Sequence, residues 1–278
     1  MVSRGKSRKL VRTSTAQAKS VPAADHLYGL GTIISAGIYV LIGEVAARAA
    51  LFAPVAFLSA AVVAAFTAFS YAELCARHPR SAGEAVYVEE VFHQPWLSGL
   101  VGWAVVLIGT ASAATLANGF VGYLKLFLSM PDWLVIGTVV IALWSLAAWG
   151  ISQSVISLIA VLNGALIQII MASRVTYGMS QQRIAPSVFA RVNPHTRTPV
   201  RATLVITVMV LILALWLPLV ALAQATSFIT LIVFALVNLS LWRLKLRGAP
   251  PEGVGVYPLW VPITGFTLCI GLVIAQIS

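Results

Sequence analysis

The stretch YGLGTIISAGIYVLIGEVAARAA, residues 28–50, decides the class of fold. It is mostly apolar and longer than the roughly 20 residues that a helix needs to cross a lipid bilayer. Ser35, Ala36 and Gly37 lie near its midpoint. Such small residues have two interpretations: close packing against a neighbouring helix, or a local unwinding whose freed amides face a bound anion. Composition by itself favours packing, and both interpretations stay open.

The composition of the whole chain agrees with a membrane location. Of its 278 residues, 60% are hydrophobic and 9% are charged, whereas an ordinary soluble domain is about 45–50% apolar and about 25% charged. These values exclude a soluble globular enzyme, a disordered protein and a disulfide scaffold. They leave a polytopic membrane protein, provided that the apolar residues form long enough runs.

Eight apolar runs are long enough, and the sequence therefore predicts an all-α polytopic membrane protein of about eight transmembrane helices. Helices follow because backbone groups cannot remain unpaired in lipid, and no alternating barrel pattern is present. Tryptophans near several of the expected ends fit an interfacial belt. The expected spans are 28–50, 52–75, 97–124, 132–150, 152–173, 202–220, 222–242 and 256–277.

The first 26 residues form a basic tail ahead of the transmembrane helical domain, residues 27–278. Six of the 18 Lys and Arg residues lie in the first 19 positions, among Ser, Thr and Gly. This composition predicts a disordered segment, which the positive-inside rule places in the cytoplasm. The tail either contacts anionic lipid headgroups or only fixes the topology.

The remaining cations conflict with a count of eight alternating spans. With a cytoplasmic N-terminus, residues 76–96 return to the cytoplasm, but residues 174–201 and 243–255 then lie outside. Those two segments hold eight of the 18 basic residues, against the positive-inside rule. Either one run between 97 and 173 does not span, or the chain lacks helices that once corrected the parity.

Three separate motifs resemble those of the amino acid–polyamine–organocation transporters, in the branch of the cationic amino acid transporters. GTIISAGIYVLIGEVAARAA (31–50) resembles the first helix of that family. YAELCARHPRSAGEAVYVEEVF (71–92) is similar to the end of its second helix and the following loop. SRVTYGMSQQRIAPSVFARVNPHTRTPVRAT (173–203) resembles the loop between its eighth and ninth helices.

The resemblance implies a secondary amino acid transporter, working by symport or exchange through alternating access, in an inverted-repeat fold with a broken first helix. Backbone amides of that helix would bind the substrate carboxylate, and Trp103 and Asn118 are further candidates that would line the pathway. The expected partners are an amino acid, a coupling proton or cation and the lipid bilayer, in the plasma (inner) membrane with a cytoplasmic N-terminus. The substrate-binding residues would be Ile33, Ile34, Ser35, Ala36, Gly37 and Ile38.

The sequence also departs from the family pattern. Residues 149–180 look like a junction between the family's fourth or fifth helix and its eighth, which implies an internal deletion around 150–165, and a last helix has no counterpart. Ser35 stands where glycine is usual. The alternative hypothesis is therefore an internally deleted, transport-inactive relative or a partner of a full-length permease. A membrane-embedded enzyme is disfavoured because no paired catalytic or metal-ligand residues are visible; no cofactor, metal or nucleic acid is expected.

Overall fold

The computed structural model describes residues 41–78, 83–125, 130–149, 160–196, 198–248 and 255–277. Within these residues every regular element is a helix, which confirms the all-α class. A helical segment at 41–49 comes first. The elements that follow are η1 (Ala50–Phe52), α2 (Ala53–Arg77), α3 (Gly83–Phe92), α4 (Pro95–Leu124), α5 (Asp132–Trp149), α6 (Ala160–Gln181), η3 (Ser187–Ala190), α7 (Val200–Trp216), α8 (Leu219–Arg247) and α9 (Trp260–Ile277).

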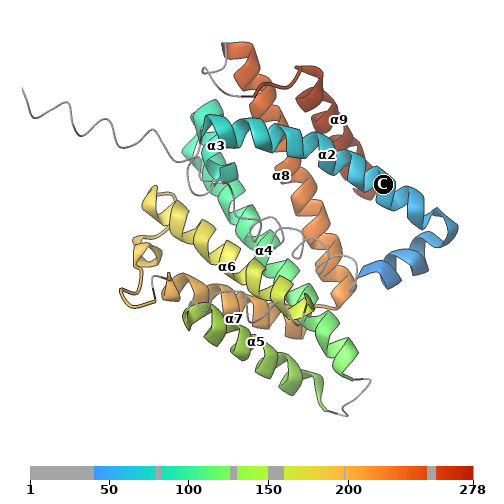
Figure 1. The fold of residues 1–278 in the computed structure, drawn as a ribbon, viewed down its shortest axis with the longest axis vertical. Helices are drawn as coiled ribbons and strands as arrows, with labels where there is room; N and C mark the ends of the chain where they lie inside the picture. The colour runs from blue at the N-terminus through green and yellow to red at the C-terminus, as the bar shows by residue number, and fades with distance from the viewer. Residues whose placement is uncertain are drawn as a thin grey trace, which may run out of the picture.

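Helix α4 is the centre of the bundle and touches α3, α5, α6, α7 and α8 (Figure 1). Pro95 occupies its first turn, where the missing amide hydrogen would have had no partner in the helix. Small residues allow the neighbouring α6 to approach closely: a Cβ at Gly109 would lie 3.0 Å from the Cβ of Ala172. In lipid, where apolar burial gives little drive for association, such close packing holds helices together.

The contacts of α4 fix the directions of its neighbours. Gly102 lies against Met179 and Gly109 against Ala172, so α6 runs antiparallel to α4. Helix α5 begins beside the end of α4, and it ends where the hydroxyl of Thr198, just before α7, donates a hydrogen bond to the carbonyl of Ala148. Helices α5 and α6 therefore run in the same direction, although only ten residues separate them in sequence (Figure 1).

This parallel pair places the basic segments of the described chain at one end of the bundle. Ile184, in the connection after α6, packs beside Gly99 at the start of α4. Lys245, near the end of α8, pairs with Glu73 near the end of α2. The conflict between the basic segments and the count of eight spans arose from the assumption that consecutive helices alternate in direction. Helices α5 and α6 do not alternate, so that assumption fails. We call this end, which carries the end of α2, α3, the α6–α7 connection and the end of α8, the basic end.

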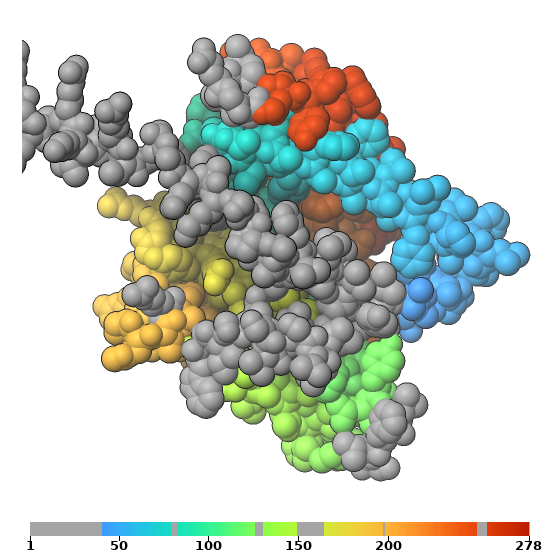
Figure 2. Space-filling view, viewed as in Figure 1, coloured from blue at the N-terminus to red at the C-terminus, as the bar shows by residue number. Residues whose placement is uncertain are grey.

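A second group of helices, α2, α8 and α9, packs on the other side of α4 (Figure 1). The side-chain amide of Asn238 in α8 fills the space over Gly265 in α9, where an added Cβ would collide with its Oδ1. At the opposite end of α2 the chain turns sharply, with φ of 46° at Ala50. Figure 2 shows this turn and the preceding helical residues projecting from the molecule.

Four helical stretches of the described chain are long and apolar enough to cross a membrane: Leu41–Arg77, Pro95–Leu124, Leu219–Arg247 and Trp260–Ile277. Helices α5 and α7 are also apolar but shorter. The protein is thus a polytopic membrane protein. Helix α6 differs most from its expected span, 152–173, because it continues to Gln181 through residues that the sequence indicated as a polar linker.

Exposed tryptophans mark both ends of the bundle. Trp96 and Trp260 lie at the basic end, whereas Trp133 and Trp216 lie at the other, and each is more than half exposed. Their separation fits α4, whose 30 residues measure about 45 Å at 1.5 Å per residue, close to the thickness of a bilayer with its headgroups. Trp242 instead packs against Phe266 of α9.

Candidate functional site

The six residues predicted to bind the substrate, 33–38, lie outside the described residues. Their role therefore stays a prediction. The two pathway candidates, Trp103 and Asn118, both belong to α4. Fifteen residues separate them, which is about 22 Å along a helix, so the structure does not bring them to one site. Trp103 is 36% exposed on the surface of the bundle.

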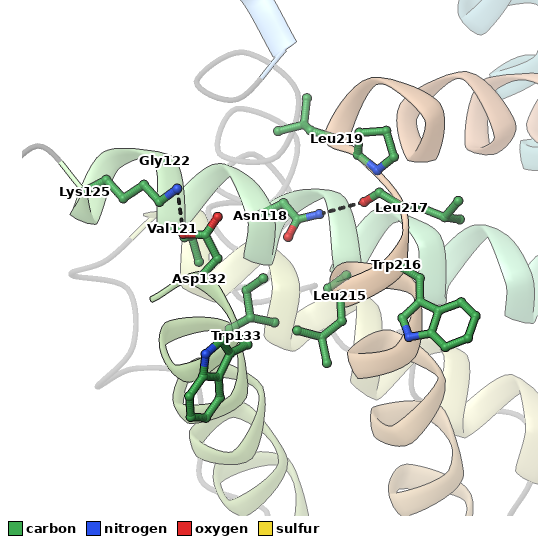
Figure 3. A pocket seen from close by; sticks show the side chains of 13 residues that line it. Asn118, Val121, Gly122, Lys125, Asp132, Trp133, Leu215, Trp216, Leu217 and Leu219 are labelled. Carbon is green, nitrogen blue, oxygen red and sulfur yellow. Dashed lines mark hydrogen bonds and ion pairs between the residues drawn. The ribbon is translucent and has the colours of Figure 1, made fainter. Parts of the chain in front are cut away.

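Asn118 lines a cavity of about 490 Å³ at the end of the bundle opposite the basic end (Figure 3). The cavity lies between the end of α4, the beginning of α5 and the turn between α7 and α8. Asn118 Nδ2 donates a 3.3 Å hydrogen bond to the carbonyl of Leu217. Leu217 has an extended backbone between α7 and α8, so its carbonyl points out of the helical path. This bond joins the turn to α4 and shapes the cavity wall.

A charged pair forms the other polar part of this cavity. Lys125 Nζ lies 2.6 Å from Asp132 Oδ1, and both side chains are about half exposed. Figure 3 shows the two side chains meeting beside Trp133, while the ring of Trp216 points away. Exposed pairs of this kind contribute about 0–1 kcal/mol. Asp132 could therefore pair with another ammonium group, and Lys125 with another carboxylate, at little cost to the stability of the fold.

The sequence did not predict a second polar site, which lies between α2 and α8 at the basic end. The carboxylate of Glu73 is fully buried. Its Oε1 lies 2.5 Å from Arg77 Nη2, and its Oε2 lies 2.7 Å from Lys245 Nζ. Oε2 also accepts a 3.0 Å hydrogen bond from the backbone amide of Tyr257. Lys245 in turn donates a 2.6 Å hydrogen bond to the carbonyl of the same Tyr257.

Hydrogen bonds continue this polar site along α2 toward the middle of the bundle. Ser70 Oγ donates to Asn238 Oδ1 at 2.7 Å, and Asn238 Nδ2 donates to Thr67 Oγ1 at 3.1 Å. All three side chains are buried. Because α2, α8 and the segment just before α9 each contribute groups, the site holds these three helices in one arrangement. Removing one member of such a buried network leaves its partners unpaired, at a high cost in stability.

A groove of about 490 Å³ lies beside this network, between α2, α3 and α8. Aromatic and small side chains line it, including Tyr71, Cys75, Tyr87 and Phe234. Tyr71 Oη donates a 3.1 Å hydrogen bond to Glu84 of α3, which fixes α3 against α2. Burial, reinforced by a hydrogen bond with Cys75, raises the pKa of Tyr87 well above its usual range.

One signal in the sequence could have identified the buried ion pairs. Glu73 and Arg77 are four residues apart, a spacing that places two side chains on one helix face, at the end of an apolar run where an isolated acid is costly. The partner Lys245 carried no such signal, because it stands among arginines that equally fit a role in topology.

Comparisons with known proteins support the resemblance along nearly the whole chain. One family model described as an amino acid permease matches residues 26–154, and a second with the same description matches residues 151–277. The two matches meet at 151–154, within the interval where the sequence indicated a junction.

Among curated proteins, the chain is 40% identical over 119 residues to the vacuolar cationic amino acid transporter 4 of Arabidopsis thaliana, covering 41% of this chain and 19% of that protein. It is 31% identical over 103 residues to a branched-chain amino acid permease of Bacillus subtilis (strain 168), covering 37% of this chain and 22% of that protein. It is 36% identical over 101 residues to cationic amino acid transporter 4 of Homo sapiens, covering 35% of this chain and 15% of that protein. The matched part of the chain thus spans less than a quarter of the length of each of these relatives.

Proposed function

We propose, from the premise that this chain belongs to the amino acid permeases of the amino acid–polyamine–organocation superfamily, that it moves an amino acid across the membrane. The observation that carries this proposal is the pair of permease matches that together extend from residue 26 to residue 277. They fall on a bundle of apolar helices that contains long membrane spans. The transport itself would be secondary active symport or exchange by alternating access.

The binding step assigned to residues 33–38 follows from backbone chemistry. Glycine at position 37 would allow the chain to leave the helical path, and the freed amide hydrogens would then point toward a carboxylate. A proton or a cation would couple the movement to an existing gradient. Gly37→Leu should abolish binding, because its side chain would occupy the space into which the carboxylate must come.

The cavity beside Asn118 supports a role in the approach of the substrate. A zwitterionic amino acid carries one ammonium and one carboxylate group, and the half-exposed pair of Asp132 and Lys125 offers a partner for each. The cavity also lies at the end opposite the basic end. We place it on the extracytoplasmic side of the plasma (inner) membrane.

This orientation follows from the positive-inside rule. Exposed cations at the basic end include Arg183, Arg191, Arg201 and Arg247. The described cations at the other end are Arg48 and Lys125, and Lys125 is paired with Asp132. The basic end would therefore face the cytoplasm. The N-terminal tail would lie there too, because the predicted span 28–50 and α2 cross in opposite directions.

A second candidate function rests on the parallel directions of α5 and α6. Two helices that run the same way and are separated by ten residues are the arrangement expected where intervening helices have been lost. The meeting point of the two family matches, 151–154, lies in this interval. The alternative is therefore an internally deleted permease that does not transport by itself, or that acts as a partner of a full-length permease.

Uptake of labelled amino acids into proteoliposomes separates the two candidates. Purified full chain, Gly37→Leu and the cavity variant Asp132→Asn are reconstituted side by side, with a cationic and a branched-chain amino acid as substrates and an imposed pH gradient. Uptake by the wild type above the Gly37→Leu level supports transport. Uptake equal to that level refutes it and favours the deleted relative.

A further inference from the structure

The connection between α6 and α7 folds back onto the end of α6 as a compact element. The hydroxyl of Ser180 donates a 2.7 Å hydrogen bond to the carbonyl of Pro186. The side-chain amide of Gln181 donates a 3.2 Å hydrogen bond to the carbonyl of Ala190, at the end of η3. These bonds hold the short helix η3 (Ser187–Ala190) in a fixed place. The connection therefore presents a defined surface at the basic end, at the yellow and orange edge of Figure 2.

Apolar residues of this connection divide into an inward and an outward set. Ile184 packs beside Gly99 of α4, and Ala185 is buried. Val188 and Val192, by contrast, are 54% and 39% exposed. Single exposed apolar residues are common on protein surfaces, so the two outward valines carry an argument only together with the cations of the same end.

The cations of this connection and of the first turn of α7 have no acidic partner among the described residues. Arg183, Arg191 and Arg201 are exposed, and no ion pair joins any of them to an acid within the described residues. The sequence contains no Asp or Glu between Asp132 and Glu252. Lys245 differs, because the carboxylate of Glu73 neutralises it inside the bundle.

We propose that Arg183, Val188, Arg191, Val192 and Arg201 form a binding surface for the headgroups of anionic phospholipids. Guanidinium groups match phosphate oxygens with two parallel hydrogen bonds. The valines insert at the boundary between headgroups and acyl chains, as the apolar side of an interfacial segment does. Cations that serve only to fix topology need no exposed apolar neighbours, and here both occur on one connection.

The lipid surface is the partner that fits both features together. A soluble anion such as phosphate would pair with the arginines but leave the valines in water. The bilayer supplies negative phosphates and hydrocarbon at the depth where the bundle ends. The proposed surface holds whether or not the chain transports an amino acid, because none of its residues lines the cavity or belongs to residues 33–38.

Native mass spectrometry of the purified full chain in nonionic detergent tests the proposal. The protein is titrated with phosphatidylglycerol, and with phosphatidylcholine as the neutral lipid. Each basic residue near an anionic surface contributes about fivefold in affinity, from about 1 kcal/mol. Arg183→Gln/Arg191→Gln/Arg201→Gln should therefore weaken phosphatidylglycerol binding about a hundred-fold. The matched variant with three Arg→Lys changes keeps the charge but loses the two parallel hydrogen bonds, and it should bind phosphatidylglycerol with an affinity between those of the wild type and the glutamine variant.

A second variant, Val188→Ser/Val192→Ser, should weaken phosphatidylglycerol binding several-fold without changing the charge. Phosphatidylcholine should bind more weakly to the wild type, and millimolar inorganic phosphate should not displace phosphatidylglycerol. The proposal is overturned if the three-glutamine variant binds phosphatidylglycerol as tightly as the wild type, or if both lipids bind the wild type equally. Displacement by inorganic phosphate would also overturn it, because the site would then recognise the free anion.

Discussion

Replacing Glu73 by Gln tests whether the buried ion pairs hold the basic end together. The substitution keeps the shape of the side chain but removes the negative charge that two buried cations share. The side chains of Arg77 and Lys245 are only 5% and 8% exposed. Removing one partner of a buried ion pair costs about 3–5 kcal/mol. Because both cations lie near helix ends and can reach toward the headgroups, we expect a value near the lower limit, about 3 kcal/mol.

The partner substitution Lys245→Met should cost less. Glu73 would keep Arg77 and the backbone amide of Tyr257, so the loss is mainly that of hydrogen bonds to charged groups, about 1.5–3 kcal/mol. In the double variant Glu73→Gln/Lys245→Met, Arg77 is the one member of the described ion pairs that keeps its charge without a partner. The loss of stability in the double variant should therefore be about 1–3 kcal/mol smaller than the sum of the losses in the two single variants, as is usual for residues in direct contact.

Thermal unfolding in nonionic detergent, followed by tryptophan fluorescence, measures these differences. At about 2–4 °C per kcal/mol for domains of 150–250 residues, Glu73→Gln should lower the melting temperature by about 6–12 °C. Glu89→Gln on α3 is the matched control, because no described ion pair contains Glu89. A melting temperature of Glu73→Gln equal to that of this control, or strictly additive shifts for the two single variants, would show that the reasoning is wrong.

Three further predictions concern packing, thiol exposure and topology. Gly109→Ala should lower the melting temperature, because its Cβ would crowd α6 at 3.0 Å, whereas Gly122→Ala in the same helix should not, because nothing lies within 4 Å. Cys75 is exposed and the cysteine of α9 is buried, so a small maleimide should label the protein once, and Cys75→Ser should abolish the labelling. In a variant without native cysteines, an impermeant maleimide should label Met130→Cys in intact cells and Ser187→Cys only after lysis. If both were labelled in intact cells, the two positions would lie on the same side of the membrane, as a count of alternating spans requires.

The apolar runs of the sequence predicted the bounds of those helices that are apolar along their whole length. The run 97–124 gives nearly the bounds of α4 (Pro95–Leu124). The end of α6 was missed because Arg174 to Gln181 is polar, yet these residues remain helical. Thr176 donates a hydrogen bond to the carbonyl of Ala172 in the preceding turn, so its hydroxyl is satisfied within the helix and can be buried. A criterion based on hydropathy cannot register that compensation.

The functional groups were less predictable than the helices. Asn118 was identified as a polar group in an apolar span, and its cavity has the mixed character that a pathway would need. The buried site of Glu73 and Lys245 was not predicted, because its members lie on different helices and come together only through the packing of α2 on α8. Pairing across helices depends on tertiary distances, which a spacing rule within one helix does not contain.

The direction of α6 shows how packing and connectivity compete in this chain. Counting crossings from the N-terminus makes consecutive helices alternate, and that count places the arginines of the α6–α7 connection outside. The contacts of Gly102 with Met179 and of Glu73 with Lys245 fit only one direction of α6 and of α8. Packing therefore determines which ends of the described helices meet, and it brings the start of the α6–α7 connection to the same end of the bundle as Lys245.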